Sequence, residues 1–150
     1  MRTPVRTFSF RAAEAFLNGF TNYERQGSFT LRRGDLSRVR TLLALLGDPQ
    51  RGIPALRVTG SKGKGTTCVI LEALLSRAGL KVGTFLSPHL ERVTERIRVG
   101  GRQLSRPRFA AALAEIAPRI AALPSPPTYF EILTALAWHV FRREEVDAAA

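Results

Sequence analysis

The stretch Val58-Thr59-Gly60-Ser61-Lys62-Gly63-Lys64-Gly65-Thr66-Thr67 decides the fold of this chain. It follows a short apolar segment and precedes one with apolar residues at helical spacing, a pattern that predicts a strand, a glycine loop and a helix. Glycines allow a tight turn that exposes backbone N–H groups, the lysines add positive charge, and the helix N-terminus adds a favourable dipole. The stretch therefore predicts a loop that binds the phosphates of a nucleoside triphosphate.

The competing interpretation is a glycine turn that simply packs tightly and binds nothing. Two lysines inside such a turn repel each other unless an anion neutralises them, which favours the phosphate interpretation. The spacing is shorter than in the commonest phosphate-binding loop, which places four residues between its first glycine and its Gly-Lys pair. Here Ser61 and Lys62 alone separate Gly60 from Gly63-Lys64.

The segments on either side of the loop predict the sheet. Residues 55–59 read as a first strand, residues 66–78 as the helix, and residues 81–86 as a second strand. A strand, a helix and a second strand in this order form a unit with parallel strands. The fold class is therefore α/β, with a parallel sheet that contains the phosphate loop and is flanked by helices.

The rest of the chain reads mainly as helices. They are expected at residues 11–20, at 36–46 after a cap at Asp35, at 106–123 after a cap at Ser105, and at 128–143. Pro118 is expected to kink or divide the third of them. Residues 95–99 and 102–104 flank Gly100-Gly101 as a small hairpin, and Val146 begins a further buried strand. Residues 1–53 would form a helical preface, and residues 54–150 the α/β part.

Composition sets limits on the class of protein. A length of 150 residues with 45% hydrophobic residues fits one globular domain. No apolar run approaches the roughly 20 residues of a membrane span, and the first ten residues are unlike a secretory signal, so a cytoplasmic location without a membrane partner is expected. The single cysteine, Cys68, reads as a buried thiol. The net charge of +11 raises nucleic-acid binding as a rival, but no recognition motif accompanies it, and we expect no nucleic-acid partner.

Further motifs point to one family. Leu86-Ser87-Pro88-His89-Leu90 and Glu95-Arg96-Ile97-Arg98-Val99 follow the second strand, and Thr128-Tyr129-Phe130-Glu131 opens the last helix. Together with the Gly-Lys-Gly-Thr ending of the glycine loop, they resemble the folylpolyglutamate synthase/dihydrofolate synthase branch of the Mur ligase superfamily. The resemblance extends from about Phe16 to Asp147.

The resemblance implies ATP and Mg²⁺ as cofactors and assigns roles to residues. Lys64, the catalytic candidate, would hold the β- and γ-phosphates, and the other loop contacts would come from Gly60, Ser61, Lys62, Gly63, Gly65 and Thr66. Ser87 would bind the magnesium ion. The pterin site would include Thr128, Tyr129, Phe130 and Glu131 and, by position alone, the loop Asn22, Tyr23, Glu24 and Arg25.

The implied reaction is an ATP-dependent ligation. ATP phosphorylates the carboxylate of dihydropteroate or a reduced folate, and the amine of L-glutamate attacks the resulting acyl phosphate to form an amide. The resemblance also implies a monomer at full length and a separate C-terminal glutamate-binding domain that these 150 residues lack. We therefore expect a truncated ATP-binding domain that is inactive alone. The alternatives are another Mur-type amide ligase and a non-catalytic nucleotide-binding module.

Each of these motifs also has a purely structural interpretation. Ser87-Pro88 can be a simple turn, and His89 reads as a hydrogen-bonding residue. Thr128 and Glu131 fit a helix capping box, a role that can coexist with ligand binding. Arg92, Arg96 and Arg98 can form a solvated strand face or border the substrate path.

Overall fold

The computed structural model describes residues 8–24 and 36–150, which divide into two compact units. The helical unit combines Met1–Pro49 with Arg106–His139, and the sheet unit combines Gln50–Ser105 with Val140–Ala150. The described helices of the expected preface group with the helices of residues 106–139. Within the described residues, no helix has the length and apolar character that crossing a lipid bilayer demands.

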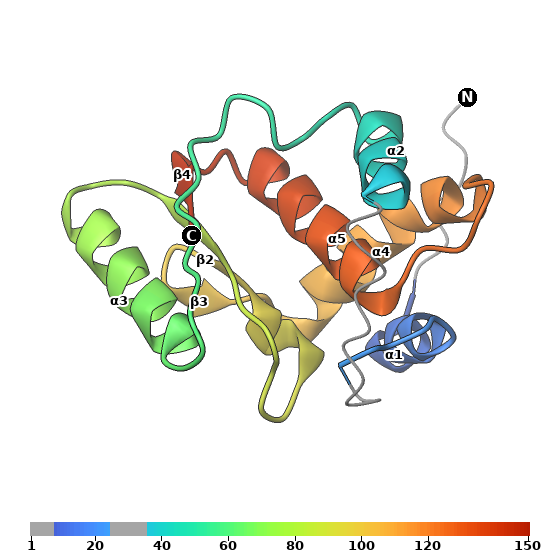
Figure 1. The fold of residues 1–150 in the computed structure, drawn as a ribbon, viewed down its shortest axis with the longest axis horizontal. Coiled ribbons are helices and arrows are strands. Elements are labelled where there is room, and N and C mark those ends of the chain that lie inside the picture. The colour runs from blue at the N-terminus through green and yellow to red at the C-terminus, as the bar shows by residue number, and fades with distance from the viewer. Residues whose placement is uncertain (1–7, 25–35) are drawn as a thin grey trace. The chain divides into compact units, whose positions relative to one another are not determined.

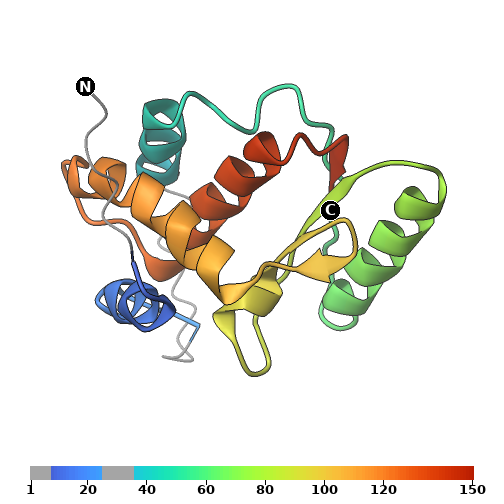
Figure 2. The ribbon, with the colours of Figure 1, turned by 180° about the vertical axis from the view of Figure 1, so that it is seen from behind.

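The helical unit holds α1 (Phe10–Asn18), α2 (Ser37–Leu45), α4 (Arg106–Ala121) and most of α5 (Tyr129–Arg143). Helices α1 and α2 both pack on α4, as Figure 2 shows from behind. The Ser9 hydroxyl caps α1 by accepting the Ala12 N–H at 3.1 Å. The expected cap of α2, Asp35, lies outside the described residues. Large apolar side chains fill the core of this unit: Leu17, Leu42, Phe109, Leu113, Leu133 and Leu136.

Helix α4 runs through Pro118 to Ala121, so the proline does not divide it. A proline inside a helix removes one backbone hydrogen bond and crowds the preceding turn. Against this local cost, α4 buries apolar side chains along its length, from Phe109 to Ile120. Tertiary packing therefore outweighs the local signal for a helix break.

The sheet unit contains four strands in the order β3-β2-β1-β4, and α3 (Lys64–Arg77) packs on β1. Figure 1 shows α3 in green beside the strands of this unit. Strand β1 pairs in parallel with β4 and antiparallel with β2, and β2 pairs antiparallel with β3. A short 3-10 helix, η1, precedes β2. The bounds are β1 Val82–Phe85, η1 Val93–Arg96, β2 Ile97–Val99, β3 Arg102–Gln103 and β4 Ala148–Ala149.

The sheet differs from the expected one in two respects. The expected strand at residues 55–59 shrinks to a single parallel bridge between Ala55 and Ala149, so β4 lies between this segment and β1. The hairpin joins the same sheet and makes it mixed rather than purely parallel. Local pattern cannot foresee either result, because both depend on which distant segments pair.

Gly83 in β1 lies directly under an aromatic ring of α5. A Cβ atom built at Gly83 would stand 2.5 Å from the ring of Phe141, whose side chain is 1% exposed. No real Cβ atom approaches an aromatic carbon so closely, so a larger residue would displace the ring. The absence of a side chain at Gly83 allows residues 140–143 of α5 to pack on β1.

Candidate functional site

The glycine loop leads directly into α3. Gly60 has a φ of 154° and Gly63 a φ of 74°, and Gly63 is the N-cap of a helix that begins at Lys64, two residues earlier than expected. Gly63 supplies no side-chain cap, and the Thr67 N–H donates to the Gly63 carbonyl at 2.9 Å. The backbone N–H groups before Thr67 have no partner within the helix, as at every helix N-terminus, and groups in this position bind anions.

The Lys64 side chain folds back over the loop. Its Nζ donates to the Gly60 carbonyl at 2.6 Å and lies 3.5 Å from the Ser61 carbonyl. The ammonium group is therefore held beside the first turn of α3, while Ser61 and Lys62 are exposed. A cation at this position would act together with the helix dipole on an anion bound at the first turn.

Packing does not explain why residue 65 is a glycine. It lies inside α3, where glycine is less favourable than alanine by about 1 kcal/mol. A Cβ atom built there would meet no other atom within 4 Å. The backbone at the first helical turn is therefore open to solvent, and a phosphate group, which needs close approach to the backbone, would meet no side chain of residue 65 there. The loop thus combines an accessible helix N-terminus with the positive charge that a polyphosphate such as that of ATP requires.

Ser87 follows β1, the strand on which α3 packs. It is exposed, and the Ser87–Pro88 peptide bond is cis. Ligands of α/β sheets bind at the carboxyl ends of the strands, where Ser87 lies. Among the residues that the structure describes, no cluster of three or more His, Cys, Asp or Glu can hold a metal ion. At this place the Ser87 hydroxyl would join phosphate oxygens and water around a magnesium ion, since Mg²⁺ keeps several waters and binds substrate phosphates.

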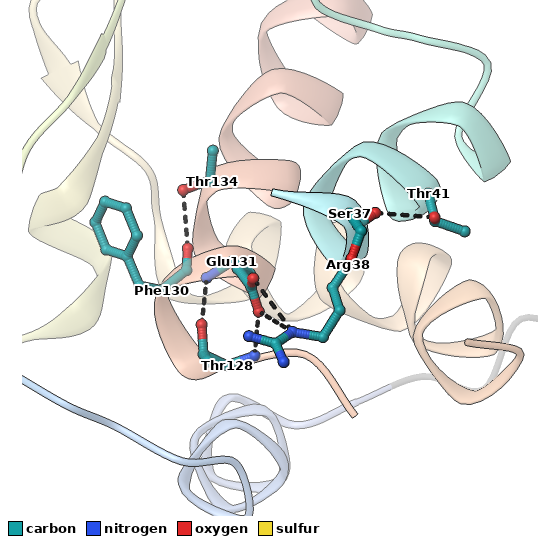
Figure 3. A network of polar contacts seen from close by, with 7 residues as sticks. All are labelled: Ser37, Arg38, Thr41, Thr128, Phe130, Glu131 and Thr134. Carbon is teal, nitrogen blue, oxygen red and sulfur yellow. Dashed lines mark hydrogen bonds and ion pairs between the residues drawn. The ribbon is translucent and has the colours of Figure 1, made fainter. Parts of the chain in front are cut away.

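The start of α5 is built as a capping box, as Figure 3 shows. The Glu131 carboxylate accepts the Thr128 N–H at 2.7 Å, and the Glu131 N–H donates to the Thr128 hydroxyl at 3.2 Å. The capping interpretation of these two residues is confirmed. Arg38 of α2 adds an ion pair, with its Nε 3.1 Å from one carboxylate oxygen of Glu131. No sequence signal pointed to Arg38, because its partner lies 93 residues away.

The two aromatic residues of the same segment have different environments. The Tyr129 side chain is 3% exposed and belongs to the core, whereas Phe130 is 43% exposed. Figure 3 shows the Phe130 ring pointing away from the Glu131–Arg38 pair. Phe130 is therefore the ring that can lie flat against a ligand.

The second candidate segment lies next to this helix start. The Tyr129 N–H donates to the Thr21 carbonyl at 3.0 Å, which brings the loop that begins at Asn22 beside the start of α5. Within that loop the Asn22 side chain accepts the Glu24 N–H at 3.1 Å, and Tyr23 is exposed. Arg25 lies outside the described residues. The structure thus brings residues 22–24 and 128–131 together in the helical unit, while the glycine loop and Ser87 belong to the sheet unit.

Of the three arginines near β2, Arg92 is exposed, as a solvated face requires, whereas Arg96 and Arg98 turn to partners within the protein. Arg96 is 1% exposed, and its Nε donates to Nδ1 of His89 at 2.7 Å. The Nε of Arg98 donates at 2.8 Å to the buried Glu72 of α3. The hydrogen-bonding role expected for His89 is thus present. Cys68 is buried as expected, and desolvation raises the pKa of its thiol.

Comparison with known proteins identifies relatives of one kind. The chain is 41% identical over 128 residues to a probable bifunctional folylpolyglutamate synthase/dihydropteroate synthase of Haloferax volcanii, covering 81% of this chain and 15% of that protein. It is 38% identical over 137 residues to the dihydrofolate synthase/folylpolyglutamate synthase of Escherichia coli, covering 91% of this chain and 32% of that protein. No family model matches the chain.

A solved structure described as an FPGS–AMPPCP–folate complex matches with a TM-score of 0.84 and 30% identity. The match covers 95% of this chain and 34% of that one. The chain thus spans about one third or less of the length of these relatives. The agreement in sequence and in fold shows that the chain belongs to the folylpolyglutamate synthase/dihydrofolate synthase family, which has the Mur ligase fold.

Proposed function

We propose that this chain is the ATP-binding part of a ligase that adds L-glutamate to dihydropteroate or a reduced folate. The observation that carries the proposal is the glycine loop, which combines Lys64 at the start of α3 with open space at Gly65. A solved structure with the same fold is described as an FPGS–AMPPCP–folate complex, and this supports both ATP and folate as ligand classes. The activity would be that of an acid–amino-acid ligase, working as a monomer in the cytoplasm without nucleic-acid or membrane partners.

The glycine loop would bind and orient the triphosphate. Bound ATP supplies the phosphoryl group that turns a carboxylate into an acyl donor. Lys64 would exchange its contact with the Gly60 carbonyl for the β- and γ-phosphates, where a cation neutralises charge. The loop residues Gly60 to Thr66 would surround the phosphates with backbone N–H groups, and Ser87 would hold the magnesium ion from the end of β1.

The helical unit would supply the pterin contacts. Phe130 exposes its ring beside the helix start that Thr128 and Glu131 fix, and a flat heterocycle stacks on such a ring. Residues 22–24 would border the same place, beside the start of α5. Thr128 and Glu131 would then act mainly by holding the backbone that carries Phe130.

The direct test measures ATP binding to the 150-residue chain by calorimetry, with and without Mg²⁺. Lys64→Ala should weaken binding by about tenfold or more, because a charged hydrogen-bond donor contributes about 1.5–3 kcal/mol. Gly65→Ala should weaken it as well by filling the open space, without loss of folding stability. Arg77→Ala is the matched control, since it removes the same charge from the exposed last turn of α3. Equal affinities for Lys64→Ala and Arg77→Ala would contradict the proposal.

A different Mur-type amide ligase is the main alternative, and ligand choice separates the two. Dihydropteroate or a reduced folate should bind and quench the chain's fluorescence, with loss of binding in Phe130→Ala. A uridine-nucleotide peptide should not bind. Binding of the peptide instead of the pterin would favour the alternative.

A further inference from the structure

The loop that carries Ser87, residues 86–92, is anchored by two consecutive residues of the next element. Glu95 in η1 turns its carboxylate back onto the end of the loop. One oxygen accepts the Leu90 N–H at 2.8 Å, and the other accepts the N–H groups of Glu91 at 3.1 Å and Arg92 at 2.7 Å. Three backbone donors on one carboxylate fix this part of the loop with charge-assisted bonds.

Arg96 fixes the beginning and the middle of the same loop. Its carbonyl accepts the Leu86 N–H at 2.8 Å, immediately before Ser87. Its side-chain Nε donates to Nδ1 of His89 at 2.7 Å, immediately after the Ser87–Pro88 pair. Because the Arg96 Nε–H is a donor only, Nδ1 of His89 is the acceptor, and this bond sets the position of the ring.

Of the two anchoring residues, Arg96 is buried and Glu95 is ionised. Arg96 is 1% exposed, and a buried guanidinium is tolerated only where the surrounding groups hold it. The N–H of Leu90, followed by those of Arg92 and Glu91, lowers the pKa of Glu95, so the anchoring carboxylate is ionised at neutral pH. Ser87, by contrast, is exposed between the anchored points.

We propose that Glu95 and Arg96 are positioning residues that hold the Ser87 hydroxyl in place for the magnesium ion of bound ATP. The inference rests on the proposed function, because it assumes that Ser87 binds the metal. Mg²⁺ requires near-ideal octahedral geometry with ligand distances of about 2.0–2.1 Å, so a hydroxyl on a mobile turn would be a poor ligand. In this proposal Glu95 and Arg96 act by fixing the loop that carries Ser87, and neither residue touches the substrate.

The test compares Glu95→Gln with Glu91→Gln, which removes the same charge from an exposed side chain of the same loop. ATP affinity is measured by calorimetry with and without Mg²⁺, and Ser87→Ala sets the full size of the magnesium effect. Glu95→Gln should lower the magnesium-dependent gain in affinity by about tenfold, the usual cost of losing a partner of a metal ligand. Magnesium-free ATP affinity should stay unchanged in both variants, because the glycine loop is intact.

Hydrogen exchange provides a readout that does not involve nucleotide. The amides of Leu90, Glu91 and Arg92 should exchange faster in Glu95→Gln than in Glu91→Gln. Arg96→Lys should act like Glu95→Gln on the magnesium effect, and thermal melting shows whether it folds. Should it fail to fold, Glu95→Gln decides alone, since Glu95 is only half-buried and glutamine keeps the size of its side chain.

The outcomes separate the two proposals. In one outcome the wild-type chain binds ATP more tightly with Mg²⁺, and Glu95→Gln shows the same magnesium effect as Glu91→Gln. This outcome would overturn the positioning role and leave the proposed function standing. A wild-type chain that ignores ATP would overturn the proposed function and this inference with it. A selective loss of the magnesium effect in Glu95→Gln supports both.

Discussion

At the scale of single residues, the lack of a side chain has different consequences at two glycines of the sheet unit, Gly65 and Gly83. Gly65 borders open space, and a Cβ atom there would meet nothing, whereas a Cβ atom at Gly83 would overlap the Phe141 ring. The first glycine keeps a surface accessible, and the second lets two elements approach. The two types of glycine look identical in the sequence, and substitution by alanine distinguishes them.

Gly83→Ala should destabilise the chain by about 1–3 kcal/mol, the usual cost of forcing extra atoms into a packed core. The buried Phe141 ring has to move, because the clash distance is 2.5 Å. Urea unfolding at equilibrium measures the effect. Restored stability in the double variant Gly83→Ala/Phe141→Leu would confirm that the ring is the cause, and unchanged stability of Gly83→Ala alone would contradict the packing argument.

The pKa of Glu95 predicts a pH effect on stability. The N–H of Leu90, with those of Arg92 and Glu91, lowers the pKa of the folded carboxyl group, so ionisation of Glu95 stabilises the folded state. This contribution is present above the unfolded pKa and is lost as the pH falls through the lowered folded pKa. The difference in unfolding free energy between wild type and Glu95→Gln should therefore be largest at neutral pH and shrink in acid. Urea titrations at a series of pH values measure it, and a difference that grows in acid would contradict the assignment.

At the scale of elements, α5 depends on its N-terminal cap. The first turn is held by the reciprocal bonds of Thr128 and Glu131 and by the ion pair with Arg38 of α2. The cap therefore joins two elements that are far apart in the sequence. The Phe130 ring projects from the same turn. Loss of the cap should therefore affect both the stability of the chain and the candidate pterin site.

Thr128→Ala should lower the unfolding free energy by about 1 kcal/mol, the typical cost of removing an N-cap hydroxyl. Thr128→Ser keeps the hydroxyl and should recover most of that loss. Circular dichroism during thermal unfolding measures both variants. If serine and alanine behave alike, the hydroxyl does not contribute as a cap.

At the scale of the whole molecule, the net charge of +11 attracts polyanions of every kind. Attraction of this type is diffuse, and salt weakens it strongly. ATP binding in the glycine loop should instead depend on Mg²⁺ and on one lysine. The two contributions can be separated by changing the ionic strength.

A single-stranded oligonucleotide should lose at least about tenfold in affinity between about 50 and 200 mM salt, because its binding releases counterions. Binding of ATP with Mg²⁺ should fall much less over the same range. Fluorescence anisotropy and calorimetry, respectively, measure the two affinities. Oligonucleotide binding that persists at the higher salt and is indifferent to Lys64→Ala would favour the non-catalytic binding module.

Much of the secondary structure follows from local pattern. All five α-helices of the described residues begin and end within two residues of their expected limits. The expected strand at residues 55–59 fails, because Ala55 alone pairs with Ala149 and the segment then leaves the sheet. A short apolar run shows the tendency to be extended, but the number of paired residues depends on a partner at the other end of the chain.

The sequence alone determined the features whose hydrogen bonds join near neighbours: the glycine loop before α3, the capping box of α5 and the apolar faces of the helices. These features depend on spacing along a few residues, which the sequence displays directly. The tertiary structure alone decided the placement of β4 beside β1, the ion pair of Arg38 with Glu131, and the burial of Arg96 under the Ser87 loop. Each of these depends on the path of the folded chain between the partners, and no local pattern records that path.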